Sequence, residues 1–216
     1  MNAVLCSLMG YLVGTINPAY IFGKIKGFDI RNRGSRNAGA SNAVILLGKA
    51  VGFICAVFDI LKAFFTYKLA KIIFPSLPYA AALAGSACII GHIFPIWMNF
   101  HGGKGLACLG GTILAYNWIF AFILLAVEII LVLSVDYICV IALTASIVLP
   151  IAYGIGTADL IGTAALAVVA VVIWIKHMEN LTRIKEGSEA HFSFLWRKDE
   201  EIERLKDKYS SEQATE

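Results

Sequence analysis

The sequence predicts an all-α integral membrane protein, a polytopic helical bundle of about seven hydrophobic segments. Of the 216 residues, 59% are hydrophobic, and the mean hydropathy is +0.76. Only 15% are charged, against about a quarter in a typical soluble domain. A single core of this size could not hide so much apolar surface from water. The composition therefore excludes an ordinary soluble enzyme and a nucleic-acid-binding module, and it indicates lipid as the surrounding medium.

Proline, glycine and charged residues divide the chain into hydrophobic segments at 3–23, 50–74, 79–100, 106–116, 118–134, 137–155 and 159–175. We expect most of them to cross the bilayer, because a helix needs about 20 residues to span a ~30 Å hydrocarbon layer. The first segment lacks the basic start and cleavage site of a signal peptide, so we expect a retained span. The segment 106–116 reaches only about 16 Å. We interpret it as a half-helix, although 106–134 could form one long helix.

The placement of basic residues predicts the orientation of the bundle. The loop after the first segment carries five of them against one acidic residue: Lys24, Lys26, Arg31, Arg33 and Arg36, against Asp29. The turn 75–78 carries none. Because short cytoplasmic loops are enriched in Lys and Arg, we predict an N-terminus outside and a C-terminus inside. Lys68 and Lys71, near the outer end of the second segment, fit this orientation if their side chains snorkel to the interface.

We expect one membrane domain over residues 1–189 and a charged cytoplasmic tail over residues 190–216. In the tail, three residues form one apolar stripe: Ile202, Leu205 and Tyr209. This stripe is compatible with a helix lying on lipid headgroups, but we favour a solvated extension.

Charges inside the hydrophobic segments need partners, because an unpaired charge in the bilayer costs about 2.5–3.5 kcal/mol on insertion scales. Asp59 and Lys62 are three residues apart on one predicted helix, so we expect an ion pair. Glu128 has no partner at helical spacing. The five cysteines lie singly in apolar stretches, without metal-ligand spacing, so we predict packing residues with no disulfide and no metal site.

The motif Gly102-Gly-Lys104-Gly105 comes directly before the short segment 106–116. A helix start presents free N–H groups and partial positive charge, and glycines let a phosphate approach the backbone closely. Lys104 adds a full charge. The motif lacks the spacing of a Walker A loop. A flexible turn with one cytoplasmic lysine is the alternative interpretation.

Two further polar stretches fall on the same predicted face. The first loop contains hydrogen-bonding side chains beside arginines, which together could cradle a phosphate: Arg33, Ser35, Arg36, Asn37, Ser41 and Asn42. Ser41 and Asn42 could instead cap the next helix. At the end of the last segment, His177, Asn180 and Arg183 recur at a spacing that places them on one helix face. His177 is the candidate general base.

These three stretches together resemble the bacterial acyl-phosphate-dependent glycerol-3-phosphate acyltransferases, the PlsY family. The matching pieces occur in the family's order: Gly34-Ser35-x-Asn37-x-Gly39-Ala40-Ser41-Asn42, then Gly91-His92-x-Phe94-Pro95 with Phe100-x-Gly102-Gly103-Lys104-Gly105, then His177-x-x-Asn180 with Arg183 and Gly187-x-Glu189. The resemblance implies an enzyme of the bacterial cytoplasmic membrane, with its active site facing the cytoplasm and no cofactor or metal. Its substrates would be acyl phosphate and glycerol 3-phosphate, acylated at the sn-1 hydroxyl to give lysophosphatidic acid for phospholipid biosynthesis.

The resemblance also suggests roles for individual residues. Lys104 and the backbone of 102–105 would bind a phosphate, helped by Ser41, Asn42 and Arg36. Ser35, Asn37 and Asn180 would orient the reacting groups or stabilise the tetrahedral oxyanion. The proton would pass to His177 or to the substrate's own phosphate. Supporting places are expected for His92, Asp59, Lys62 and Glu189, with His92 equally suited to holding a loop or to acting directly.

The chain departs from the family pattern in two places near the expected phosphate site. Arg36 stands where a glycine is usual, and Ile45 stands where an arginine is usual. Loss of a cation at position 45 should weaken phosphate binding, and Arg36 could compensate. Two other classes remain open: a transporter of a phosphorylated solute, which broken helices and a basic loop would also suit, and a non-catalytic paralogue.

Overall fold

The computed structural model describes residues 1–197, 200, 201 and 204, and all regular secondary structure in this part of the chain is helical. Its α-helices are α1 (Asn2–Gly14), α2 (Pro18–Ile25), α3 (Ala40–Leu47), α4 (Lys49–Ile73), α5 (Ala80–Ile93), α6 (Leu106–Tyr116), α7 (Trp118–Val135), α8 (Cys139–Thr157) and α9 (Leu160–Glu186). Short 3₁₀ turns occur at η1 (Ile30–Asn32), η2 (Ile96–Met98) and η3 (Phe192–Leu195). The stripe of Ile202, Leu205 and Tyr209 lies outside the described residues.

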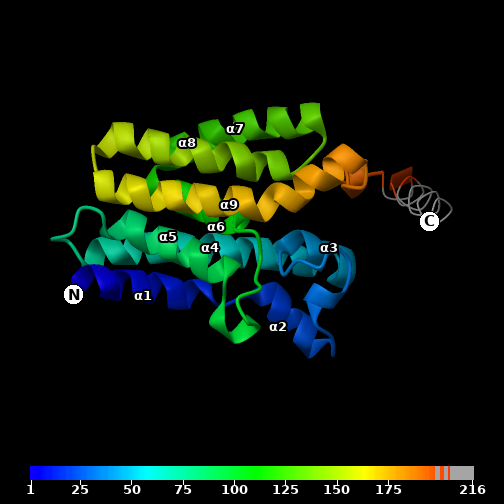
Figure 1. Cartoon of the computed structure of the whole chain (residues 1–216), viewed down its shortest axis with the longest axis horizontal. Coiled ribbons are helices and arrows are strands. Elements are labelled where there is room, and N and C mark those ends of the chain that lie inside the picture. The colour runs from blue at the N-terminus through cyan, green and yellow to red at the C-terminus, as the bar shows by residue number, and fades with distance from the viewer. Residues whose placement is uncertain (198–199, 202–203, 205–216) are drawn as a thin grey trace.

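The long helices run side by side as an antiparallel bundle (Figure 1). Within the described residues, six stretches are long and apolar enough to cross a membrane: Asn2–Ile25, Lys49–Ile73, Ala80–Met98, Trp118–Val135, Cys139–Thr157 and Leu160–Glu186. The shorter α6 is the predicted half-helix. The Asn117 side chain separates it from α7 by accepting a hydrogen bond from the backbone N–H of Phe120 at 3.1 Å. The predicted multi-pass class is therefore confirmed.

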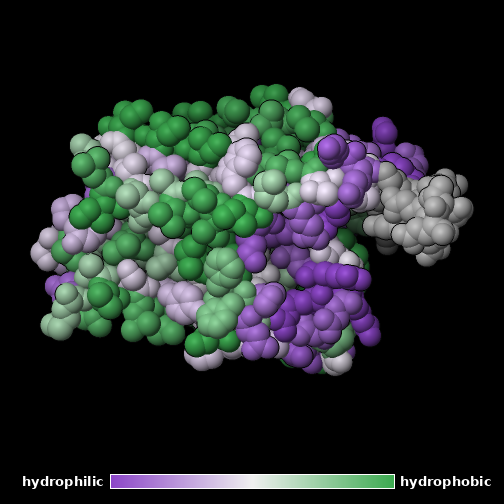
Figure 2. Space-filling model, in the orientation of Figure 1, coloured by the Kyte–Doolittle hydropathy of each residue, from purple (hydrophilic) through white to green (hydrophobic). Residues whose placement is uncertain are grey.

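The first and last long helices start and finish at opposite ends of the bundle. α1 begins at one end of the bundle and α9 ends at the other (Figure 1). Figure 2 shows hydrophilic residues gathered over the end that carries α2 and α3, while apolar side chains cover much of the rest of this face. The assignment of the hydrophilic end to the cytoplasm remains a prediction from the basic loops.

The first predicted span is broken near the end that leads into the first polar loop. Asn17 caps α2 by accepting a hydrogen bond from the N–H of Tyr20 at 2.8 Å, and Pro18 occupies the first helical position. Because proline lacks an N–H and asparagine competes with helical hydrogen bonds, this pair favours a new helix start. The Asn17 Nδ2 also donates to the carbonyl of Ala38 at 2.8 Å, which attaches the break to the first polar loop.

The predicted boundaries of two other segments change, and one helix is new. α5 ends at Ile93 rather than at residue 100, because Pro95 cannot continue the helix. α9 continues to Glu186 rather than ending at residue 175, and it stops at Gly187, whose φ is +71°. The helix α3 was not expected, because its eight residues merged with the polar loop in the sequence.

Glu128, for which no local partner was found, is buried on α7 and accepts hydrogen bonds from Thr144 Oγ1 on α8 at 2.7 and 2.8 Å.

Small residues allow the helices that carry the polar end to pack closely. A Cβ added at Gly10 or Gly14 of α1 would lie 2.3 or 2.1 Å from a backbone oxygen of α5. A Cβ at Gly111 of α6 would lie 2.1 Å from the carbonyl oxygen of Ile60 on α4. Such contacts are typical of membrane helices, where close backbone approach replaces hydrophobic driving force. The five cysteines are free and buried, as expected.

Candidate active site

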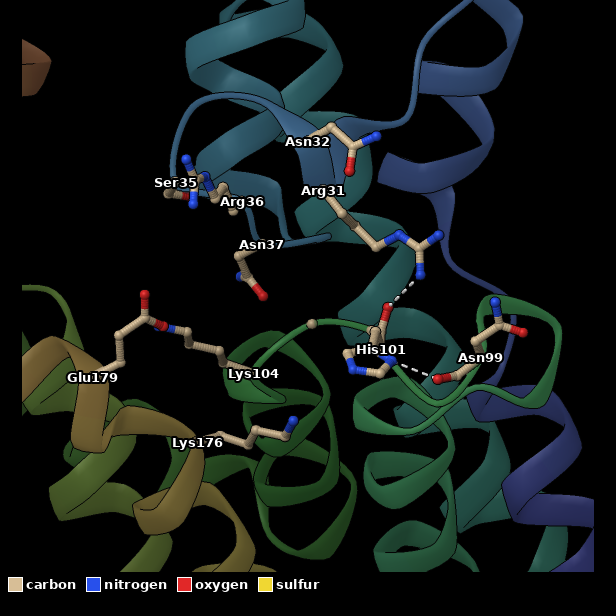
Figure 3. A pocket seen from close by; sticks show the side chains of 12 residues that line it. Arg31, Asn32, Ser35, Arg36, Asn37, Asn99, His101, Lys104, Lys176 and Glu179 are labelled. Atoms are coloured by element: carbon tan, nitrogen blue, oxygen red, sulfur yellow. Dashed lines mark hydrogen bonds and ion pairs between the residues drawn. The ribbon is translucent and has the colours of Figure 1, made fainter.

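The three polar stretches meet in one cavity of about 540 Å³ at the hydrophilic end of the bundle. Figure 3 shows its lining, which comes from the first loop, from the loop before α6 and from α9: Arg31, Asn32, Ser35, Arg36, Asn37, Asn99, His101, Gly102, Gly103, Lys104, Lys176 and Glu179. Four of these twelve residues are arginine or lysine and one is acidic. A concave site with this charge balance favours an anionic ligand.

Six of the predicted site residues line this cavity: Ser35, Arg36, Asn37, Gly102, Gly103 and Lys104. Asn180 lies behind Lys104 and contacts it. The other predicted residues lie outside the lining: Ser41, Asn42, Asp59, Lys62, His92, Gly105, His177 and Glu189. The structure therefore separates the predicted set into residues of the cavity wall and residues outside it.

Asn42 holds the first polar loop together. Its fully buried side chain donates from Nδ2 to the carbonyls of Ile30, Arg33 and Asn37 at 2.9, 3.1 and 3.0 Å. Its Oδ1 accepts from the backbone N–H of Ser35 at 3.0 Å. With every polar group of its side chain engaged inside the loop, Asn42 shapes the cavity wall that presents Ser35 and Asn37.

Arg36 occupies its family-atypical position with a left-handed backbone, at a φ of +56°. Glycine adopts this conformation without a steric penalty, so a glycine would also suit this position. Here the arginine side chain lines the cavity, whereas Ile45 lies on α3 and is 48% exposed. The chain therefore has a cationic side chain at position 36 and an uncharged one at position 45.

Lys104 is fixed by a chain of polar contacts from α9. Its Nζ donates to Asn180 Oδ1, and Asn180 Nδ2 donates to Glu189 Oε1 at 2.5 Å. The second carboxylate oxygen of Glu189 accepts from Arg183 Nε at 2.6 Å. Asn180 and Glu189 are buried, so this chain determines where the ammonium group lies. His177 is also buried, with Nδ1 bonded to the carbonyl of Ile173 at 2.8 Å.

The pH dependence of phosphate binding should follow from Lys104. Burial in its loop lowers the pKa of this lysine below the usual 10.5, because it disfavours the charged form. Only protonated Lys104 attracts a phosphate, so kcat/KM for a phosphorylated substrate should fall as pH rises through this lowered pKa. Because the phosphate dianion is already formed above about pH 7, it does not titrate over the range pH 7.5–10.5. Measuring kcat/KM across this pH range tests the prediction. In Lys104→Arg the loss of activity should move above this range. A wild-type kcat/KM that stays constant across the range would contradict the prediction.

The backbone of the Gly102–Gly105 motif was expected to bind a phosphate, but its first two amides bond to the end of α5 instead. The N–H groups of Gly102 and Gly103 donate to the carbonyls of Ile93 and His92 at 3.0 and 3.1 Å, so these two amides are not available to a phosphate. A Cβ at Gly102 would lie 2.1 Å from the carbonyl oxygen of His92, and a Cβ at Gly103 would lie 2.1 Å from its Nε2. The glycines are needed because the loop lies against the end of α5. Gly105, with a φ of +90°, starts α6.

A buried charged cluster stands behind this loop. Lys62 Nζ lies 2.6 Å from Asp59 Oδ1 and 3.1 Å from His92 Nδ1, which confirms the predicted pair. The same ammonium donates to the carbonyls of Gly14 and Ile16 at 3.1 and 2.6 Å, at the break between α1 and α2. The cluster thus joins α1, α4 and α5 beneath the cavity, and His92 supports the loop.

The cluster also bears on metal binding. Asp59, His92 and Cys108 offer ligand atoms within 4.8 Å of one another. The Lys62 ammonium already contacts two of these residues, and its charge would repel a metal cation. The donor set therefore does not fit a metal ion.

Asp59→Asn should destabilise the protein strongly, because it leaves the Lys62 charge buried without its carboxylate. Breaking a buried ion pair in this way costs about 3–5 kcal/mol. We expect thermal unfolding in detergent to shift to a clearly lower temperature. Lys71→Gln, an exposed change on the same helix, should leave the unfolding temperature unchanged. Equal unfolding temperatures for Asp59→Asn and the wild type would show that the pair does not hold these helices.

Several cavity residues were missed from the sequence. Arg31, used only as an orientation signal, donates to the carbonyls of Met98 and His101 at 2.6 and 3.2 Å and pairs with Asp29 at 2.7 Å. It thereby attaches the first loop to the second. Lys176 and Glu179 flank His177 in sequence, and their place one turn apart on the extended α9 was the available signal. Asn99, with a φ of +52°, ends η2 within the loop before α6.

Comparison with known proteins agrees with this architecture. A family model described as glycerol-3-phosphate acyltransferase matches residues 4–187. Glycerol-3-phosphate acyltransferase 1 of Oceanobacillus iheyensis is 36% identical, covering 92% of this chain and 99% of that protein. The corresponding protein of Lactiplantibacillus plantarum is 35% identical, covering 94% of this chain and all of its own length.

A solved structure gives the same result for the fold. The glycerol 3-phosphate form of PlsY (YgiH), an integral membrane glycerol 3-phosphate acyltransferase, aligns with a TM-score of 0.81 and 29% identity. The alignment covers 90% of this chain and 98% of that one. The chain belongs to the glycerol-3-phosphate acyltransferase family, and the resemblance noted in its three polar motifs is confirmed.

Proposed function

We propose that this protein transfers a fatty acyl group from acyl phosphate to the sn-1 hydroxyl of glycerol 3-phosphate, giving lysophosphatidic acid and inorganic phosphate. The observation that carries the proposal is the cationic cavity, in which Lys104 and Arg36 lie at the polar end of a membrane bundle. A site there can receive a charged acceptor from water and an acyl chain from lipid. PlsY is known in glycerol 3-phosphate and lysophosphatidic acid forms, which supports this acceptor and product.

The chemistry makes modest demands on the protein. Acyl phosphate is a mixed anhydride and is already activated. The acceptor hydroxyl oxygen forms a bond to the acyl carbon, the bond from that carbon to the phosphate oxygen breaks, and the hydroxyl proton passes to a base. Holding the two reactants in line can supply about 7–11 kcal/mol of the barrier reduction. Lys104 and Arg36 would offset the repulsion between the two phosphates.

Ser35, Asn37 and Asn180 would orient the acceptor or stabilise the tetrahedral oxyanion. The proton acceptor would be His177 or the phosphate of the acyl donor. Because Nδ1 of His177 is bonded to the carbonyl of Ile173, only Nε2 is left to accept a proton. By the orientation that the basic loops predict, this site would face the cytoplasm across a bacterial cytoplasmic membrane.

The test is a reconstituted assay on the purified full-length protein. Supplied with acyl phosphate and glycerol 3-phosphate, it should form lysophosphatidic acid acylated at sn-1 and release one phosphate per product. Acyl-coenzyme A, offered in place of acyl phosphate, should give no product. Acylation from acyl-coenzyme A alone would overturn the donor assignment. Uptake of glycerol 3-phosphate into sealed vesicles without any product would favour the transporter.

A further inference from the structure

Glu179 places a negative charge in a cavity whose other charged residues favour an anion. It is the single carboxylate among the residues that line the cavity, and its side chain is 64% exposed. Its Oε2 lies 3.6 Å from Lys104 Nζ, and its Oε1 lies 2.6 Å from Arg183 Nη1. In Figure 3 the Lys104 and Glu179 side chains point toward each other at one edge of the cavity. The carboxylate thus bridges two cations beside the expected phosphate site.

A phosphate that binds Lys104 would meet this carboxylate. Two anions sharing one ammonium repel each other, so one of them must withdraw. Lys104 cannot follow Glu179, because its side chain is only 15% exposed and is hydrogen-bonded to the buried Asn180. Glu179 can move, because it is exposed and its contact with Lys104 is the longer of its two ion pairs.

We propose that Glu179 is a specificity-determining residue that neutralises Lys104 in the empty site and is displaced by the phosphate of glycerol 3-phosphate. This inference rests on the proposed function and deepens it. A phosphate dianion carries more charge than the carboxylate and can displace it, whereas a monoanion gains little by the exchange. Competition between the Glu179 carboxylate and inorganic phosphate for Lys104 also lowers the affinity for inorganic phosphate, so this product dissociates faster after each turnover.

The test is Glu179→Gln, which keeps the shape and removes the charge. The variant should lower KM for glycerol 3-phosphate and the inhibition constant of inorganic phosphate by about two- to tenfold, the range of a partly exposed ion pair beside a buried lysine. Glu179→Asp keeps the charge but shortens the side chain, so its constants should lie between those of the wild type and of Glu179→Gln. Glu186→Gln removes the same charge from an exposed position of α9 outside the cavity lining, and should change neither constant.

Binding measured without any acyl donor separates this inference from the proposed reaction. Titration calorimetry of inorganic phosphate should show tighter binding to Glu179→Gln than to the wild type. If the wild type binds phosphate but never acylates glycerol 3-phosphate, the proposed function fails while tighter binding by the variant still supports displacement. A folded Glu179→Gln protein with unchanged or weaker phosphate binding would overturn the inference. A higher KM of Glu179→Gln for glycerol 3-phosphate would also overturn the inference, since it would mean that Glu179 positions Lys104.

Discussion

Lys104→Ala is expected to lower kcat/KM for glycerol 3-phosphate by about 10²–10³-fold, the loss typical of a preorganised group that stabilises developing charge. The Lys104 side chain lines the cavity, is only 15% exposed, and is held by Asn180. Alanine removes this charge and its charge-assisted contact with the network of Asn180, Glu189 and Arg183. Steady-state rates with purified protein, at fixed acyl phosphate and varied glycerol 3-phosphate, measure the effect.

Lys185→Ala is the matched control, because it removes a lysine from the exposed surface of the same end of α9. It should act at the wild-type rate. Acylation by Lys104→Ala at the wild-type rate would remove this residue from the phosphate site, and with it the interpretation of the cavity.

Gly103→Ala should reduce activity by about 10²-fold without changing any charge. A Cβ at this position would lie 2.1 Å from Nε2 of His92 and 2.9 Å from its Cε1. His92 cannot withdraw easily, because its ring is buried and contacts Lys62 and Asp59 at 3.1 and 3.3 Å. The loop must therefore shift, and a displacement of about 1 Å at the neighbouring Lys104 can cost about 10²-fold in rate.

Gly110→Ala is the control for this change. It lies on α6, close to Gly103 in the chain, and an added Cβ there meets nothing within 4 Å. Both variants should remain folded, as measured by thermal unfolding in detergent, and only Gly103→Ala should lose activity. Equal rates for the two would mean that the contact of the loop with His92 does not position the site.

Composition and local pattern were sufficient for much of this architecture. The membrane class followed from hydropathy, and the half-helix followed from the length of 106–116 and was confirmed by α6 and its Asn117 boundary. The Asp59–Lys62 pair could be predicted because its members are neighbours on one helix face. The three polar stretches could be expected to meet because the order of the seven predicted segments places them at one end.

Other features depend on contacts between distant segments, which a local pattern does not contain. The partner of Glu128 lies on the next helix, at Thr144. Asn42 carries hydrogen-bonding groups suited to a phosphate, but the fold uses all of them to close the first loop. The amides of Gly102 and Gly103 were expected to face a ligand, yet they bond to the end of α5. In each case the polar group was identified correctly and its partner could not be.

The most direct test of the account is a crystal structure of this protein with glycerol 3-phosphate bound. We predict phosphate oxygens within hydrogen-bond distance, about 2.7–3.2 Å, of Lys104 Nζ and of the Arg36 guanidinium. We also predict that the Glu179 carboxylate has moved away from Lys104. A phosphate bound elsewhere on the protein, with this cavity unoccupied, would contradict the account.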